Sequence, residues 1–197
     1  SLSRIELNEH VLPQEEVDLV AAVNDVIDAV APLARDKGVH LEVSLPPRGL
    51  ALSVGDRDQM VQVAQNLVDN ALKYSPAGGA VEVRVAVGLT AEAAAAARHT
   101  KRYAALSVTD SGPGMAREHL PRLTERFYRV EGQKSGDKLG TGLGLAIVKH
   151  IMNRHRGGLA VESAPGRGAT FTAFFPLSPG APSAQLPAAP DAVTKVS

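Results

Sequence analysis

Apolar residues recur with helical spacing between Asp56 and Ser75 and predict a long amphipathic helix. Asp56 can cap the start of this helix, and Pro76 followed by a glycine pair ends it. Because the apolar positions lie three or four residues apart, they form one stripe that packs on a core. They are Met60, Val63, Leu67 and Ala71.

A second face of this predicted helix carries Asn66, Asn70, Lys73 and Tyr74 at the same spacing. A solvated helix face normally carries Glu and Lys, which form helices better than Asn does. Two Asn residues one turn apart therefore cost some helix stability. This face is either a tolerated polar surface or a binding surface, and the rest of the chain favours binding.

Other segments alternate as strands or recur as helices. The strands arrive in adjacent pairs between helices, which favours a mixed, mostly antiparallel sheet with helices on one face. The predicted fold class is therefore a two-layer α/β sandwich. The expected helices span Asp18–Ala34 and Leu143–Arg156, and the expected strands span Val39–Leu45, Leu52–Val54, Val81–Val87, Ala105–Thr109, Leu159–Ser163 and Ala169–Phe175.

The ends of the chain differ from its centre in composition. Residues 1–15 are expected to be a helix remnant and a linker, and residues 16–176 to form the domain. Residues 177–197 are rich in Pro and Ala and are expected to be a disordered tail. The Ala-rich stretch 88–102 is expected to be a surface insertion.

Composition narrows the function classes. The 197 residues hold 21 basic and 21 acidic side chains, so no overall charge favours a nucleic-acid partner. The chain has no cysteine, which excludes disulfides and thiolate metal sites and fits a reducing compartment. No apolar run approaches the roughly 20 residues of a membrane span, and none resembles a signal peptide. We expect the fragment to be soluble and cytoplasmic.

Asp110-Ser-Gly-Pro-Gly114 directly follows a predicted strand. An Asp at the end of a strand, followed by two glycines without side chains, can present a carboxylate at the floor of a pocket. Such a carboxylate can accept a hydrogen bond from an exocyclic amine and so distinguish adenine from guanine. A plain turn explains the same residues, so this motif alone is a weak signal.

Gly140-Thr-Gly-Leu-Gly-Leu145 precedes a predicted helix. Its glycines expose backbone N–H groups and the helix adds the positive end of its dipole, which together suit phosphate. The spacing is not that of a dinucleotide fingerprint or of a P-loop. A flexible hinge before a helix is the alternative.

Glu125-Arg-Phe-Tyr-Arg129 lies upstream of these glycines, and the connection from Val130 to Leu139 contains further glycines and lysines. A segment of this kind fits a lid that closes over phosphates, or else an ordinary surface loop. The later Gly166–Thr170 is compatible with a plain hairpin turn.

Each motif is weak alone, but their order along the chain is specific. From about Val17 to Pro176 the sequence resembles the catalytic, ATP-binding domain of two-component sensor histidine kinases, and most closely the phosphate-sensing and osmosensing type. In the terms of that family, the chain carries an N box (Asn66–Ser75), a G1 box (Asp110–Gly114), an F box (Glu125–Arg129), a G2 box (Gly140–Leu145) and a G3 region (Gly166–Thr170).

The resemblance implies the Bergerat ATP-binding fold, shared with gyrase, Hsp90 and mismatch-repair ATPases, with ATP and Mg²⁺ as ligands. Asn66 and Asn70 would hold Mg²⁺, and Asp110 would accept from the adenine amine. Asn66, Lys73 and Arg129 would act in catalysis. The implied nucleotide contacts are Asn66, Asn70, Lys73, Tyr74, Asp110, Gly112, Gly114, Arg129, Lys134, Gly140, Thr141, Gly142, Leu143, Gly144, Leu145 and Thr170.

Asn66 bears on the kind of reaction. Hydrolytic relatives carry at this position a glutamate that activates water, whereas an amide cannot act as a general base. The resemblance therefore implies transfer of the γ-phosphoryl group by orientation and charge neutralisation. A Bergerat-fold ATPase and an anti-sigma-type serine kinase stay open as alternatives. Intact Asn70, Asp110 and G2 glycines argue against a non-enzymatic module with a decayed pocket.

The acceptor histidine of the family is expected to lie outside this chain. His119 is followed by Leu-Pro-Arg-Leu-Thr, which is similar to the acceptor motif but lacks its acidic residue. We expect all the histidines here to be structural or on the surface. The resemblance implies a separate dimerisation and phosphoacceptor domain and a response-regulator receiver domain as partners, with no nucleic acid. It also implies a homodimeric parent at the cytoplasmic membrane and a monomeric fragment.

Overall fold

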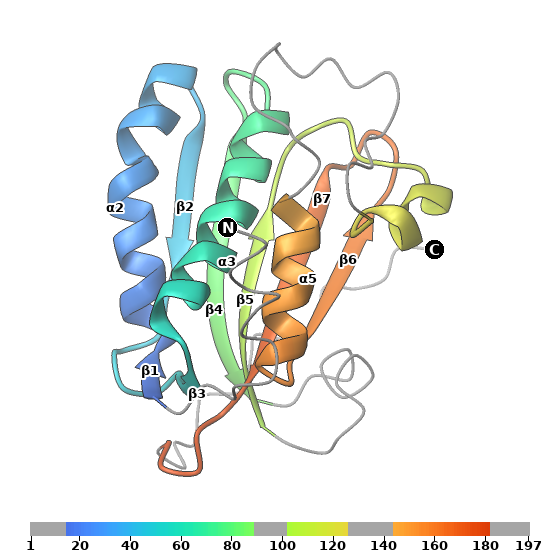
Figure 1. Ribbon diagram of the computed structural model, residues 1–197. Helices are drawn as coiled ribbons and strands as arrows, with labels where there is room; N and C mark the ends of the chain where they lie inside the picture. Colours follow the sequence, from blue (N-terminus) through green and yellow to red (C-terminus); the bar gives the residue numbers. More distant parts are fainter. Residues whose placement is uncertain (1–14, 89–101, 126–143, 182–197) are drawn as a thin grey trace.

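The computed structural model describes residues 15–88, 102–125 and 144–181. Within them, β2 (His40–Ser44), β4 (Ala80–Gly88), β5 (Tyr103–Thr109), β7 (Ala169–Pro176) and β6 (Gly158–Ser163) form one sheet in that order. β2 and β4 are parallel, and the other pairs are antiparallel. The helices α2 (Leu19–Lys37), α3 (Arg57–Tyr74) and α5 (Gly144–Arg154) cover one face (Figure 1). The predicted two-layer α/β sandwich is confirmed.

Polar caps set where the long helices begin and end. The Asp56 side chain accepts a hydrogen bond from the Gln59 N–H at 3.1 Å and caps α3, which ends at Ser75 as expected. Asp18 caps α2 in the same way. Gly38 ends α2 with a φ of 68°, a left-handed conformation that glycine adopts without strain. Local sequence signals therefore account for these boundaries.

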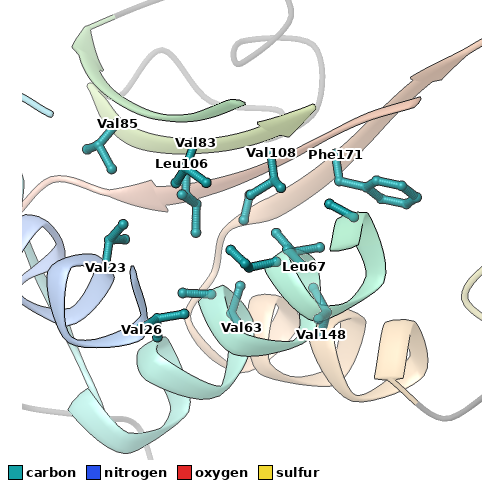
Figure 2. Close-up of a cluster of buried hydrophobic side chains, with 14 of the residues drawn as sticks. Val23, Val26, Val63, Leu67, Val83, Val85, Leu106, Val108, Val148 and Phe171 are labelled. Carbon is teal, nitrogen blue, oxygen red and sulfur yellow. The ribbon is translucent and has the colours of Figure 1, made fainter. Parts of the chain in front are cut away.

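The core lies between the helices and the inner face of the sheet. All four residues of the predicted apolar stripe on α3 are buried. Burying a Val or Leu side chain of this kind contributes about 1.5–3 kcal/mol, so this layer holds α3 firmly in place. Figure 2 shows the contact between the layers, with Val23, Val26, Val63, Leu67 and Val148 from the helices facing Val83, Val85, Leu106, Val108 and Phe171 from the strands.

A second, two-stranded sheet consists of β1 (Glu15–Asp18) paired antiparallel with β3 (Leu52–Gly55). The chain beyond β7 binds to it, because Leu177 forms a bridge with Ser53 and the Ser178 N–H donates to the Leu52 carbonyl at 2.8 Å. Ser178 is buried. The packed unit therefore extends past Pro176, where the sequence placed the start of the tail.

Several expectations concern residues outside the described ranges. These are the helix remnant within 1–14, nearly all of the insertion at 89–101, and the tail from 182 onward. Between β5 and α5, residues Arg117–Arg122, which include His119, form a short 3-10 helix, η1. In the part of the chain that the structure describes, no helix combines the length and apolarity that a membrane crossing needs.

His155 joins the end of α5 to the start of α3. Its Nδ1 lies 2.8 Å from the Ile151 carbonyl, and its Nε2 accepts the Asp56 N–H at 3.0 Å. The ring is therefore neutral, with its proton on Nδ1. It is buried and meets the Phe175 ring edge-on at 5.9 Å. This bond ties together two helix ends that are far apart in the sequence.

Burial lowers the pKa of His155, and the Arg154 charge acts in the same direction, while the Ile151 carbonyl and Asp56 oppose them. In the unfolded chain a histidine titrates near about pH 6.5. The unfolded state then binds more protons below that pH, so His155 makes stability fall as the pH drops below about 6.5 and changes nothing above it. We expect His155→Gln to flatten the pH dependence of the unfolding free energy below about pH 6.5. Denaturant titrations at several pH values measure this, and equal slopes in both proteins would contradict it.

Candidate functional site

The polar face of α3 lies beside the start of α5. Asn66, Asn70, Lys73 and Tyr74 are all half-buried. The Asn66 Nδ2 donates to the carbonyl of Gly144, the first residue of α5, at 3.5 Å. This is a long and weak hydrogen bond. It nevertheless shows that the N box and the last glycine of the G2 box, 78 residues apart, are in contact.

The charges near this contact favour an anion. The first N–H groups of a helix have no partners within the helix, and the positive end of the helix dipole lies there. α5 begins at this contact. Lys73, in the last turn of α3, adds a cation, and its Nζ lies 5.2 Å from the centre of the Tyr74 ring. Leu145, by contrast, packs against the core and anchors α5. The junction between α3 and α5 therefore suits a phosphate group.

The donor set at this junction fits Mg²⁺ bound together with phosphates. Among the described residues, no group of three or more His, Cys, Asp or Glu side chains could hold a metal ion. The amide oxygens of Asn66 and Asn70 are hard ligands of the kind that Mg²⁺ prefers, and Mg²⁺ usually completes its coordination with water and substrate phosphates. The Asn66 hydrogen bond uses the amide nitrogen and leaves the oxygen for a cation.

Asp110 is a buried carboxylate at the end of β5, with 6% of its surface exposed. Its Oδ1 accepts the N–H of Gly112 at 2.9 Å and that of Ala169 at 3.3 Å. Within the described ranges, no residue donates to Oδ2. Burial raises the pKa of the Asp110 carboxyl, and the two N–H groups act in the opposite direction. One oxygen is thus held by the protein, and the other can accept from a ligand.

The glycines of the G1 box are required by close packing of the backbone. A Cβ at Gly112 would lie 2.7 Å from the Tyr74 carbonyl oxygen, and a Cβ at Gly114 would lie 1.9 Å from that of Ala164. Gly168 closes the same arrangement, since its Cβ would lie 2.1 Å from the Asp110 carbonyl oxygen. These residues therefore let the Asp110 loop fit between the end of α3 and the β6–β7 turn.

Like Leu145, which packs against the core, Thr170 is a predicted site residue that the structure does not bring into this group. Its hydroxyl lies 2.9 Å from that of Thr109 on the neighbouring strand. Ala169 next to it is buried, so the two side chains lie on opposite faces of β7. The residue of this segment that contacts Asp110 is Ala169, through its backbone N–H.

Two serines near Asp110 received no role from the sequence. Ser75 ends α3, and its Oγ accepts the N–H of Ser111, the residue after Asp110. A small hydroxyl residue at a helix end and another directly after the key Asp are common turn formers, so nothing in the sequence distinguished them.

The expected lid lies outside the described residues. This holds for Arg129, Lys134, Gly140, Thr141, Gly142 and Leu143, and of the F box Glu125 alone is described. Their predicted roles stay predictions.

Comparison with known families gives one match that covers most of the chain. Residues 55–179 match the family described as histidine kinase-, DNA gyrase B- and HSP90-like ATPases. The matched range includes the N, G1, F, G2 and G3 segments.

Curated relatives are sensor proteins. The chain is 40% identical over 142 residues to the phosphate regulon sensor protein PhoR of Pseudomonas aeruginosa, covering 72% of this chain and 29% of that protein. It is 31% identical over 175 residues to the sensor histidine kinase WalK of Bacillus subtilis, covering 89% and 27%. The chain thus spans less than a third of the length of these two relatives.

Solved structures of the same fold include a mycobacterial sensor histidine kinase, MprB, with a TM-score of 0.67 and 29% identity over 82% of this chain and 97% of that one. The full-length ShkA structure, a complex with AMPPNP, has a TM-score of 0.70 over 91% of this chain and 34% of that one. At 24% identity, ShkA supports the fold alone.

Two glycine substitutions separate close packing from backbone strain. Gly114 and Gly166 have similar φ angles, 69° and 77°, but no atom lies within 4 Å of a Cβ built at Gly166. Gly166→Ala should cost about 1–2 kcal/mol of unfolding free energy for the left-handed conformation alone. Gly114→Ala should cost about 1–3 kcal/mol more, because its Cβ enters filled space. Denaturant unfolding measures both, and equal losses would show that the G1 loop is not closely packed at Gly114.

Proposed function

This chain belongs to the histidine kinase-, DNA gyrase B- and HSP90-like ATPase family, as the catalytic ATP-binding domain of a sensor histidine kinase, and on that premise we propose how it works. It binds Mg²⁺-ATP along α3, between Asp110 and the start of α5. It then presents the γ-phosphoryl group to a histidine on a separate helical domain.

The contact between Asn66 and Gly144 carries this proposal. It joins the carboxamide face of α3 to the N-terminus of α5, so hard oxygen ligands and phosphate-binding N–H groups meet at one place. Asn66 and Asn70 would hold Mg²⁺ there, and the ion would supply positive charge against the phosphates. Asn66, Asn70 and Lys73 then position the triphosphate, and Arg129 and Lys134 contact it from the lid.

The other end of the nucleotide is recognised by Asp110. Its Oδ1 is occupied by backbone N–H groups, and its Oδ2 accepts from the adenine amine. A guanine would bring a carbonyl to this place and leave the buried carboxylate without a partner, which costs about 1–3 kcal/mol. Adenine is therefore favoured.

Transfer is favoured over hydrolysis because the residue beside Gly144 is an amide. Asn66 can orient a phosphate or a cation, but it cannot take a proton from water. The chain is then a phosphoryl donor that needs an acceptor brought to it.

The rest of the signalling protein is proposed from the family. The acceptor domain precedes this catalytic domain, which starts near residue 16. The whole protein forms a homodimer at the cytoplasmic membrane, whereas the chain described here is a monomer. The receiver domain of a response regulator takes the phosphoryl group from the histidine.

Mixing the chain with a helical hairpin that bears an acceptor histidine, and with γ-labelled ATP, tests the proposal. We expect label on the hairpin histidine. Asn70→Ala should slow labelling by about 100-fold, because a misplaced triphosphate is no longer in line with the acceptor.

Asn153→Ala is the matched control, since it removes an exposed carboxamide in the last turn of α5, away from the start of that helix. It should label the hairpin at the parent rate within about twofold, as surface substitutions usually change little. Steady release of phosphate with no label on the hairpin would refute transfer and support the ATPase alternative.

A further inference from the structure

Ser75 and Ser111 form a link between the end of α3 and the Asp110 loop. Ser75 is the C-cap that directly follows α3, is buried, and donates its own N–H to the Ala71 carbonyl at 3.0 Å. Its Oγ accepts the Ser111 N–H at 3.2 Å. The two residues are 36 positions apart, so this bond is a tertiary contact between two motifs.

The Ser111 side chain extends the link to the sheet. Its Oγ donates to the Ala80 carbonyl at 2.9 Å and lies 3.0 Å from the Ala80 nitrogen, which donates to it. Ala80 is the first residue of β4. The preceding position, Gly79, requires glycine, because a Cβ there would lie 2.4 Å from the Ser111 Oγ. The residue after Asp110 is therefore held by a helix end and a strand start together.

Asp110 is held on its other side by β7. Its own N–H donates to the Ala169 carbonyl at 2.9 Å, and its Oδ1 accepts the Ala169 N–H. These bonds place the carboxylate relative to the sheet but not relative to α3. Gly112 packs against the Tyr74 carbonyl at the end of α3, and the Ser75 hydroxyl adds a hydrogen bond to the same place. This hydrogen bond gives the loop a directional link to the helix that carries Asn66, Asn70 and Lys73.

We propose that Ser75 and Ser111 are positioning residues that set the separation between the base-reading carboxylate of Asp110 and the metal-binding face of α3. The inference rests on the proposed function of that site. Because α3 is a rigid helix, moving its C-cap relative to Asp110 changes the distance from Asp110 to each of the polar side chains that the helix presents to the nucleotide. A nucleotide can satisfy both ends when that distance matches its length.

Ser75→Ala tests this inference, with Ser107→Ala as the matched control. Ser107 is on β5, the strand that directly precedes Asp110. Its substitution also removes one hydroxyl contact, to Thr172 at 3.0 Å, but on the face of the sheet away from the helices. We expect Ser75→Ala to bind a non-hydrolysable ATP analogue about five- to tenfold more weakly, the equivalent of one hydrogen bond. Ser107→Ala should bind it as the parent does, within about twofold.

A purely structural role would lower stability without changing base selectivity. The ratio of affinities for the ATP and GTP analogues should fall in Ser75→Ala. It should return to the parent value in Ser75→Thr, which keeps the hydroxyl. When Ser75→Ala is added to Asp110→Asn, the ratio should change little further. Ser111→Ala keeps the N–H bond to Ser75 and should show a smaller loss. It also supplies the test if Ser75→Ala does not fold.

An unchanged selectivity ratio in folded Ser75→Ala and Ser111→Ala would overturn the inference, as would an equal effect of Ser107→Ala. Failure of the proposed nucleotide site looks different, because the parent chain itself would then bind no ATP analogue.

Discussion

Burying the Asp110 carboxylate costs free energy unless hydrogen-bond donors surround it, and much of the site exists to supply them. Gly112 and Ala169 donate to one oxygen. That requires β7 to pair with β5 in the observed register and the G1 loop to turn back on itself. Positions 112, 114 and 168 require glycine because the backbone segments that carry these donors are in such close contact that a Cβ would not fit. The second oxygen is what remains for a ligand.

A second constraint, the packing of α5 along α3, decides where the proposed phosphate site lies. α3 and α5 run antiparallel, since Asn66 contacts the start of α5 while Asp56 contacts His155 just past its end. The start of α5 is thereby held against the middle of α3, and the helix dipole acts beside the carboxamides. A buried, neutral histidine at one end of a helix pair thus supports an anion site at the other.

Much of the fold could be predicted from the sequence. The apolar stripe from Met60 to Ala71, the caps at Asp18 and Asp56, and the alternation in β4 are local signals, and each element formed where they indicated. The site was less accessible. Thr170 matched a motif, but its side chain lies beside Thr109 on the neighbouring strand. This pairing between strands cannot be seen in the local sequence. Ser75, Ser111 and Ala169 act through backbone and hydroxyl contacts that depend on tertiary structure. Ser178 packs on β1 although its neighbourhood is rich in Pro and Ala.

Calorimetric titration of this chain with a non-hydrolysable ATP analogue, with and without Mg²⁺, tests the central claim most directly. The parent should bind one molecule saturably and more tightly with Mg²⁺, and it should prefer the ATP analogue over the GTP analogue. Asp110→Asn should reduce that preference, because the amide no longer presents the same acceptor to the base. No saturable binding in either condition, or a preference that Asp110→Asn leaves unchanged, would contradict the account.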